Sequence, residues 1–154
     1  MRALRLADAG AARALVSAHV GGTRYSARTY EVLRLALIGS DDEHIGLILP
    51  ASASHADDAS LSAVAVIGAV AGASGAWRLH WLFAQSLTTA TLLASAVVDV
   101  ARDRGARLVV CELPTDAPFV AASDAVADAG FILEGAVPDF VRDGIALRLW
   151  VVRF

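Results

Sequence analysis

The stretch WRLHWLFAQSLTTATLLASA, residues 77–96, joins a predicted strand to a predicted helix. Apolar side chains dominate Trp77–Ala84, as in a buried strand, and the helix that we expect over Thr88–Arg104 ends at Gly105. A strand that turns directly into a helix often binds phosphate, because the first N–H groups of the helix are free to donate. Residues 83–96 contain no glycine and no basic residue. The junction therefore raises the question of what it can hold.

The composition limits the class of protein. Of the 154 residues, 56% are hydrophobic and 19% are charged, which favours a folded domain over a disordered chain. A formal net charge of -3 gives no electrostatic footprint for nucleic acid. The single Cys111 excludes an intramolecular disulfide and is expected to be a buried thiol, and the four histidines lack the spacing of metal ligands. The bias towards alanine, arginine, valine and aspartate indicates a GC-rich bacterial source.

One segment, Ala59–Trp77, carries no charge and is nearly long enough to span a bilayer. It is rich in alanine, serine, glycine and valine, and Gly72 and Gly75 favour a turn between two strands. We therefore expect a core hairpin here in preference to a membrane helix. The N-terminal sequence MRALRLADAG lacks the apolar region of a secretory signal, so we expect a cytoplasmic protein without membrane contact.

Predicted strands and helices alternate along the chain. In order, the patterns indicate a strand, two helices, three strands, a helix, a strand, a helix and two final strands. This order predicts an α/β fold, α+β in the character of its mixed sheet, in a single domain over residues 1–154.

The C-terminal run ADAGFILEGAVPDFVRDGIALRLW, residues 127–150, carries a family resemblance. Its GF pair, its PDF triplet and its RDG triplet resemble the end of proteins in the GNAT superfamily of N-acyltransferases, and the element order agrees over essentially the whole chain. The resemblance implies the GNAT fold. It also implies direct transfer of an acyl group from a phosphopantetheine thioester to an amine, with no metal.

The strand Arg78–Ala84 resembles the fourth strand of that family, whose backbone binds the pantetheine arm and the thioester carbonyl. The resemblance therefore implies donor binding by the backbone of Leu82, Phe83 and Ala84. A thioester carbonyl becomes an oxyanion when an amine attacks it, and a preorganised N–H beside it stabilises that charge.

The donor-binding features that should follow this strand are incomplete. The family's glycine-rich loop wraps the pyrophosphate of coenzyme A, but the connection here is shorter by roughly four residues, and Gln85 is the only residue near its Arg/Gln position. Thr88 and Ala90 stand at its glycine positions, and Val126 stands where a tyrosine acid is usual. The helix start can still bind one anionic group through Thr88 and Thr89. These departures favour an acyl carrier protein as donor, while acyl-CoA, the family's default, stays open.

Three residues near the ends of two strands are candidates for the chemistry. His80 is the candidate general base for the amine, because a histidine with an ordinary pKa near 6.5 titrates close to neutral pH. Arg78 shares its face of the strand, since side chains alternate, and is a candidate acceptor-binding residue. Glu112 ends the next strand and is a candidate base or anchor for the amine. The alternatives are a structural histidine and a solvated carboxylate.

Tyr25, Asp139 and Arg142 are further candidates for the acceptor pocket, although the last two could instead solvate a turn. The sequence thus predicts an N-acyltransferase acting on a small-molecule amine, with natural-product biosynthesis as one setting. The competing hypothesis is a non-catalytic GNAT-like module that binds a ligand or partner, because such a module needs no donor loop. Apolar strands near the C-terminus are compatible with a homodimer.

Overall fold

The computed structural model describes residues 1–39, 43–51 and 60–154. The strands in these residues are β1 (Arg2–Ala3), β2 (Ile45–Pro50), β3 (Leu61–Ala69), β4 (Ala76–Ala84), β5 (Leu108–Pro114), β6 (Ile132–Arg142) and β7 (Ile145–Arg153). The α-helices are α1 (Ala9–Val20), α2 (Ser26–Ile38), α3 (Leu87–Asp103) and α4 (Val120–Asp128), and short 3-10 turns precede α1 and α4.

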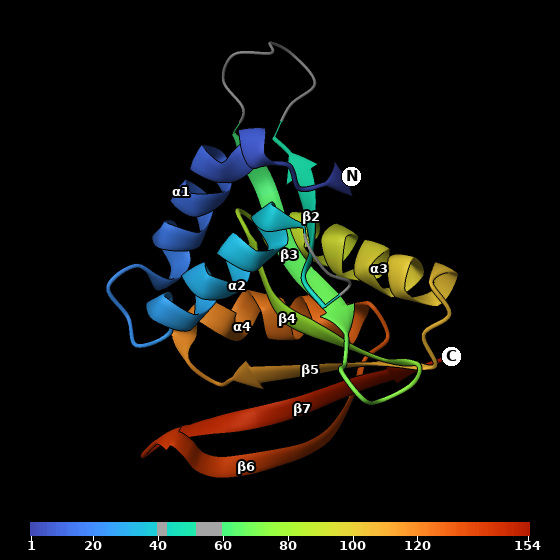
Figure 1. Ribbon diagram of the computed structural model, residues 1–154. Helices are drawn as coiled ribbons and strands as arrows, with labels where there is room; N and C mark the ends of the chain where they lie inside the picture. Colours follow the sequence, from blue (N-terminus) through green and yellow to red (C-terminus); the bar gives the residue numbers. More distant parts are fainter. Residues whose placement is uncertain (40–42, 52–59) are drawn as a thin grey trace.

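The strands form one mixed sheet in the order β1-β2-β3-β4-β5-β7-β6. Neighbouring strands are antiparallel except β4 and β5, which are parallel and are connected through α3. The helices α1 and α2 pack together over one face of the sheet, and α3 and α4 pack together over the other (Figure 1). The expected mixed α/β fold class is confirmed.

The uncharged segment forms the β3–β4 hairpin, as expected. The centre of β3, from Val64 to Ile67, is completely buried because helices cover both of its faces. Gly72 and Gly75 adopt positive φ angles of 74° and 72° in the connection, a conformation that a side chain disfavours. No helix among the described residues is both long enough and apolar enough to cross a membrane.

The C-terminal hairpin differs from the expectation. We expected a strand that ends before Pro138 and a loop over PDFVRDG, but β6 continues to Arg142 with an irregular register after Val137. Asp139 has a positive φ of 53°, and its carboxylate accepts a hydrogen bond of 2.7 Å from the Gly144 N–H. This side chain stabilises the turn into β7, which agrees with the alternative role expected for Asp139.

Two adjacent leucines of α3 test the packing of this core. Leu93 is completely buried, whereas 59% of Leu92 is exposed. We expect Leu93→Ala to lower the free energy of unfolding by about 2–5 kcal/mol, because it removes buried methyl groups and leaves a cavity. Leu92→Ala should change it by less than about 0.5 kcal/mol. Urea denaturation of both variants measures the difference, and equal losses would contradict this placement of α3.

Candidate active site

The two parallel strands in the middle of the sheet separate part of the way along. The β4–β5 pairing runs from Ala76 opposite Leu108 to Leu79 opposite Cys111. Beyond that point β4 continues to pair with β3 as far as Ala84, while β5 continues to pair with β7 as far as Pro114. The strands therefore form a fork, and one edge of β4 is open along its second half.

The open edge exposes particular backbone groups. The Gln85 N–H donates to the Ser62 carbonyl at 2.8 Å, so Gln85 and, by alternation, Phe83 direct their backbone towards β3. Leu82 and Ala84 direct theirs towards the open edge. The predicted donor-binding set is therefore corrected: the Phe83 backbone belongs to the β3–β4 ladder, and Leu82 and Ala84 remain.

A β-bulge on β4 lies at the base of the fork. Val66 pairs with Trp81 and Ile67 pairs with Leu79, which leaves His80 as the extra residue. Bulges redirect side chains and are common beside active sites. This one accompanies a cavity of about 150 Å³, which we call the fork cavity. It is lined by Arg28, Val32, Arg78, Leu79, His80, Trp81 and Glu112.

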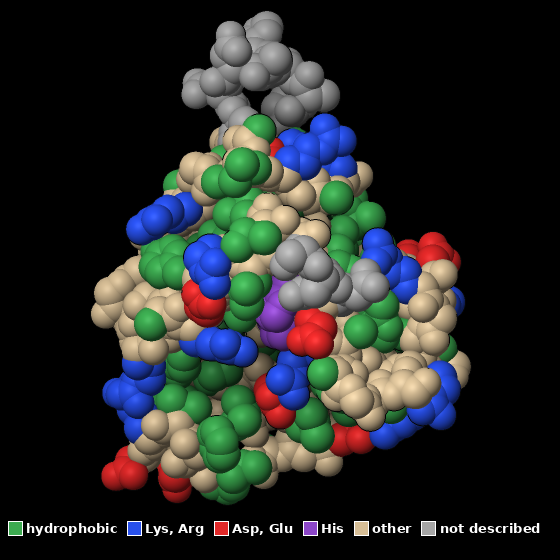
Figure 2. Space-filling model, viewed as in Figure 1, with side chains coloured by type: hydrophobic (Ala, Val, Ile, Leu, Met, Phe, Trp, Pro, Cys, Tyr) green, Lys and Arg blue, Asp and Glu red, His purple; other side chains and the backbone are tan. Residues whose placement is uncertain are grey.

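The fork cavity brings together three of the predicted site residues, namely Arg78, His80 and Glu112. A second cavity of about 270 Å³ shares Arg28, Arg78 and His80 with it and reaches Glu43 and His44. Figure 2 shows histidine, arginine and acidic side chains gathered in the middle of this face. The sequence reasoning missed Arg28, whose only signal is a basic residue in the first turn of α2.

His80 is held in one orientation by its neighbours. Its Nε2 atom lies 2.9 Å from the Glu43 carbonyl oxygen, which only accepts hydrogen bonds, so Nε2 carries the proton and Nδ1 of the neutral ring is an acceptor. The His44 ring stacks on it at 5.0 Å. Burial lowers the pKa of His80 to about 4, and the Glu43 hydrogen bond only partly opposes this effect. The expected base with a pKa near 6.5 is therefore corrected to a histidine that is neutral at physiological pH.

A glycine makes the Glu43 contact possible. A Cβ atom built on Gly68, in the middle of the hairpin, would lie 1.9 Å from the Glu43 carbonyl oxygen. Gly68 pairs with Arg78 across the hairpin, so the two residues face the same part of the site. The missing side chain lets the chain before β2 approach β3 closely enough to hold His80.

Several polar groups of the fork cavity lack partners. Within the described part of the chain, no hydrogen bond or ion pair joins Arg28, Arg78 or Glu112 to another residue. The Nε atom of Arg78 and the Nε1 atom of Trp81 are buried without a hydrogen-bond acceptor, and only 4% of Trp81 is exposed. Buried donors without acceptors are uncommon because each one costs free energy. The charged groups of Arg28, Arg78 and Glu112 are therefore available to a ligand in the fork cavity.

The other predicted acceptor residues meet at a separate cluster. The Tyr25 hydroxyl donates to Asp116 at 3.1 Å, and Arg142 lies 3.8 Å from the same carboxylate oxygen. Burial, followed by the hydrogen bond to Asp116, raises the pKa of Tyr25. The Tyr25 ring packs edge-on against Phe119 with centroids 4.9 Å apart. Tyr25 and Arg142 thus connect the α1–α2 segment to the end of β5 and to β6, and neither lines the fork cavity.

The helix start that follows β4 carries a side-chain cap. Ser86 caps α3: its hydroxyl accepts from the Thr89 N–H, and the Thr89 hydroxyl accepts from the Ser86 N–H, both at 3.2 Å. The anion-binding role predicted for Thr89 is therefore corrected, because its N–H donates to the Ser86 hydroxyl and its own hydroxyl is bonded to Ser86 and Ser62. Thr88 remains exposed at the second helical position.

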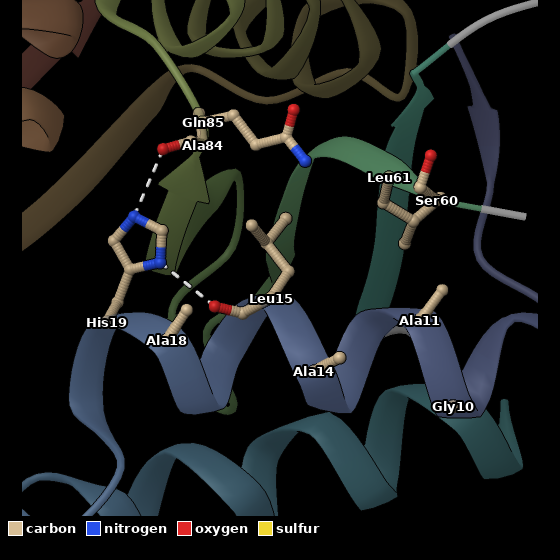
Figure 3. Close-up of a pocket in the computed structure, with 10 residues that line it drawn as sticks. All are labelled: Gly10, Ala11, Ala14, Leu15, Ala18, His19, Ser60, Leu61, Ala84 and Gln85. Carbon is tan, nitrogen blue, oxygen red and sulfur yellow. Dashed lines mark hydrogen bonds between the residues drawn. The ribbon is translucent and has the colours of Figure 1, made fainter.

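A larger cavity of about 750 Å³ adjoins the end of β4 and is lined mainly by alanine, leucine and glycine, with His19, Gln85 and Ser60 (Figure 3). His19 closes one side of it, with its ring nitrogens 2.9 Å from the Leu15 carbonyl oxygen and 3.0 Å from that of Ala84. No arginine lines this cavity among the described residues. It is suited to an uncharged chain and poorly suited to a pyrophosphate.

Comparison with solved structures identifies the architecture. A protein of Desulfovibrio desulfuricans described as a GNAT-family acetyltransferase aligns with a TM-score of 0.75 at 22% identity, covering 99% of this chain and 96% of its own. YncA of Salmonella typhimurium, described as an acetyltransferase and solved with acetyl-CoA, aligns with a TM-score of 0.69 at 15% identity, covering 99% of this chain and 91% of its own. The ribosomal-protein-S18-alanine N-acetyltransferase of Escherichia coli gives 0.71 at 13% identity over 99% and 91%. This chain has the GNAT fold. No protein-family model and no curated protein sequence matches it.

The GNAT fold expected from the C-terminal run is thus confirmed by structure, while the sequence itself is divergent. Val126, at the position where the resemblance leads one to expect a tyrosine, is completely buried in α4 and has no proton to give. The fork, the bulge and the open edge of β4 are present in this GNAT fold, whereas its helix start carries a serine cap.

The pKa of His80 predicts how stability depends on pH. An unfolded histidine has a pKa near 6.5, so below that pH the unfolded chain binds a proton that the folded chain does not bind until the pH nears 4. We therefore expect the wild type to lose about 2–3 kcal/mol more than His80→Gln between pH 7 and pH 4. Denaturant unfolding at several pH values measures this, and parallel losses in the two proteins would show that His80 is not buried as described.

The role of Gly68 can be tested separately. We expect Gly68→Ala to displace Glu43, to cost about 1–3 kcal/mol of stability, and to release His80 from its single tautomer. Long-range 1H–15N NMR of the imidazole should then show a mixture of Nε2–H and Nδ1–H forms. Gly135→Ala is the matched control, since its added Cβ meets no atom within 4 Å. A pure Nε2–H tautomer in the Gly68 variant would contradict the positioning role.

Proposed function

We propose that this protein is an N-acyltransferase that moves an acyl group from a phosphopantetheine thioester to the amine of a small molecule. The observation that carries the proposal is the juxtaposition at the fork. The open backbone edge of β4 at Leu82 and Ala84 adjoins a cavity lined by Arg78, His80 and Glu112. The open edge can hold an extended arm that carries amides, and the cavity can hold a polar acceptor at the end of that arm.

The reaction requires little of the protein beyond positioning. The amine nitrogen attacks the thioester carbonyl carbon, a C–N bond forms, the C–S bond breaks, and the amine loses one proton. An N–H on the open edge stabilises the intermediate oxyanion. The Glu112 carboxylate and the neutral Nδ1 of His80 accept hydrogen bonds from the amine and orient it, and the proton that the amine loses goes to solvent. A thiol with a pKa near 8.5 leaves as a thiolate, which explains how activity could persist with Val126 in place of an acid.

The residues present fit one part of coenzyme A better than another. The pantetheine arm is an extended chain with two amides, and the Leu82 backbone and the Ala84 N–H offer it hydrogen bonds, the Ala84 carbonyl being already bonded to His19. The pyrophosphate would meet a helix start capped by Ser86 and Thr89, and a large cavity whose described lining contains no arginine. YncA is described with acetyl-CoA, which supports an acyl-CoA donor, but these contacts favour a donor recognised through its arm, such as an acyl carrier protein.

The capped helix start also supports the competing function, a GNAT-like module that binds a small molecule or partner without catalysis, because such a module needs no site for a pyrophosphate. The two functions differ in one respect: only the enzyme releases a thiol.

The donor is tested with three acetyl thioesters: acetyl-CoA, acetyl-phosphopantetheine and an acetylated carrier protein. Thiol release is followed with a panel of primary amines. We expect acetyl-phosphopantetheine to match acetyl-CoA in kcat/KM within about threefold, because the adenosine diphosphate portion finds no dedicated contacts. The chain contains no lysine, so self-acylation at its N-terminus can account for at most one turnover.

A hundredfold preference for acetyl-CoA would overturn the recognition through the arm while leaving the acyltransferase intact. No thiol release with any donor and amine would overturn the acyltransferase and favour the binding module.

A further inference from the structure

We infer that the fork cavity binds an acceptor that carries a carboxylate close to its amine, that is, a free amino acid or a near analogue. The inference rests on the proposed function, in which this cavity receives the acceptor, and it goes beyond that function by defining the chemical class. The GNAT fold itself does not require it, because an amine alone is sufficient for acyl transfer.

Two arginines supply the contacts for the carboxylate. Arg28 reaches the fork cavity from α2 and Arg78 from β4, and within the described residues neither has a carboxylate partner. Other arginines of the described residues do have a carboxylate partner, as Arg34 has Glu31 on the same helix. A guanidinium binds a carboxylate through two parallel hydrogen bonds. The terminal nitrogens of Arg78 can supply these bonds, since only its Nε atom is buried without a partner.

The opposite charge in the same cavity supplies the contacts for the amine. Glu112 is the carboxylate that lines the fork cavity, and the Nδ1 atom of His80 is a second acceptor for an ammonium or amine N–H. The adjoining cavity adds the side chains of Glu43 and His44, both of which already interact with other groups. A ligand with one positive and one negative group can therefore pair with Glu112 and with the two arginines of the same cavity.

The dimensions and the donors agree with a small ligand. The fork cavity measures about 150 Å³ and the adjoining one about 270 Å³, with three lining residues in common. Trp81 lines the fork cavity with its ring, and its Nε1 atom is buried without an acceptor. A protein N-terminus is a less suitable acceptor. Its first residue carries a peptide amide where a free amino acid carries a carboxylate, so the two guanidinium groups would stay unpaired.

Binding is tested first, without any acyl donor. Each of the twenty common amino acids is titrated by calorimetry, and the tightest binder is then compared with its carboxamide and its decarboxylated amine. We expect at least one amino acid to bind, and both analogues to bind at least tenfold more weakly. Arg28→Gln and Arg78→Gln should each weaken the amino acid at least tenfold, while Arg34→Gln on the same helix should change Kd by less than twofold.

Acyl transfer to the same compounds separates this inference from the proposed function. Equal kcat/KM for the amino acid, its carboxamide and its amine would overturn the inference and leave the acyltransferase standing. Amino-acid binding that depends on both arginines, without thiol release from any donor, would overturn the acyltransferase and leave the binding site standing. Absence of binding by all twenty amino acids would also overturn the inference.

Discussion

The separation of β5 from β4 after the Leu79–Cys111 pair is the constraint on which the site depends. Each strand is held on its outer side, β4 by β3 and β5 by β7, and those ladders continue after the β4–β5 pairing stops. The backbone of β4 is left without a neighbouring strand, which is normally a liability in a sheet. Under the proposed function, the open edge binds an extended ligand, which adds what amounts to another strand.

Local packing then sets what lies at the base of the fork. The bulge at His80 turns His80 and Trp81 into the cavity that Arg78 also lines, and Gly68 admits the Glu43 carbonyl that fixes the imidazole. These arrangements carry a cost, since buried donors on Arg78 and Trp81 stay unpaired.

The sequence predicts much of this framework and only part of the chemistry. Strand and helix periodicity gave α3 within a residue of its observed bounds, and alternation along the strand placed Arg78 with His80. Two of the errors arise where a distant segment decides the outcome. The pKa of His80 depends on burial, and the recruitment of Arg28 depends on how α2 crosses the sheet, and neither is visible in the spacing of residues along one element. The cap between Ser86 and Thr89 is local, and the Ser-x-x-Thr spacing at the helix start was its signal.

Under the proposed function, the two halves of the site recognise their ligands by different means, and this difference bears on specificity. On the donor side the contacts are backbone groups of Leu82 and Ala84 and an uncharged cavity, which recognise any extended amide chain alike. On the acceptor side Arg28, Arg78 and Glu112 carry charges that most amines cannot match at once. Under the proposed function, selection of the acceptor is therefore built into the fork cavity. Selection among donors with the same arm must come from whatever lies beyond the arm. A carrier protein has a surface of its own and can supply contacts that the capped start of α3 does not.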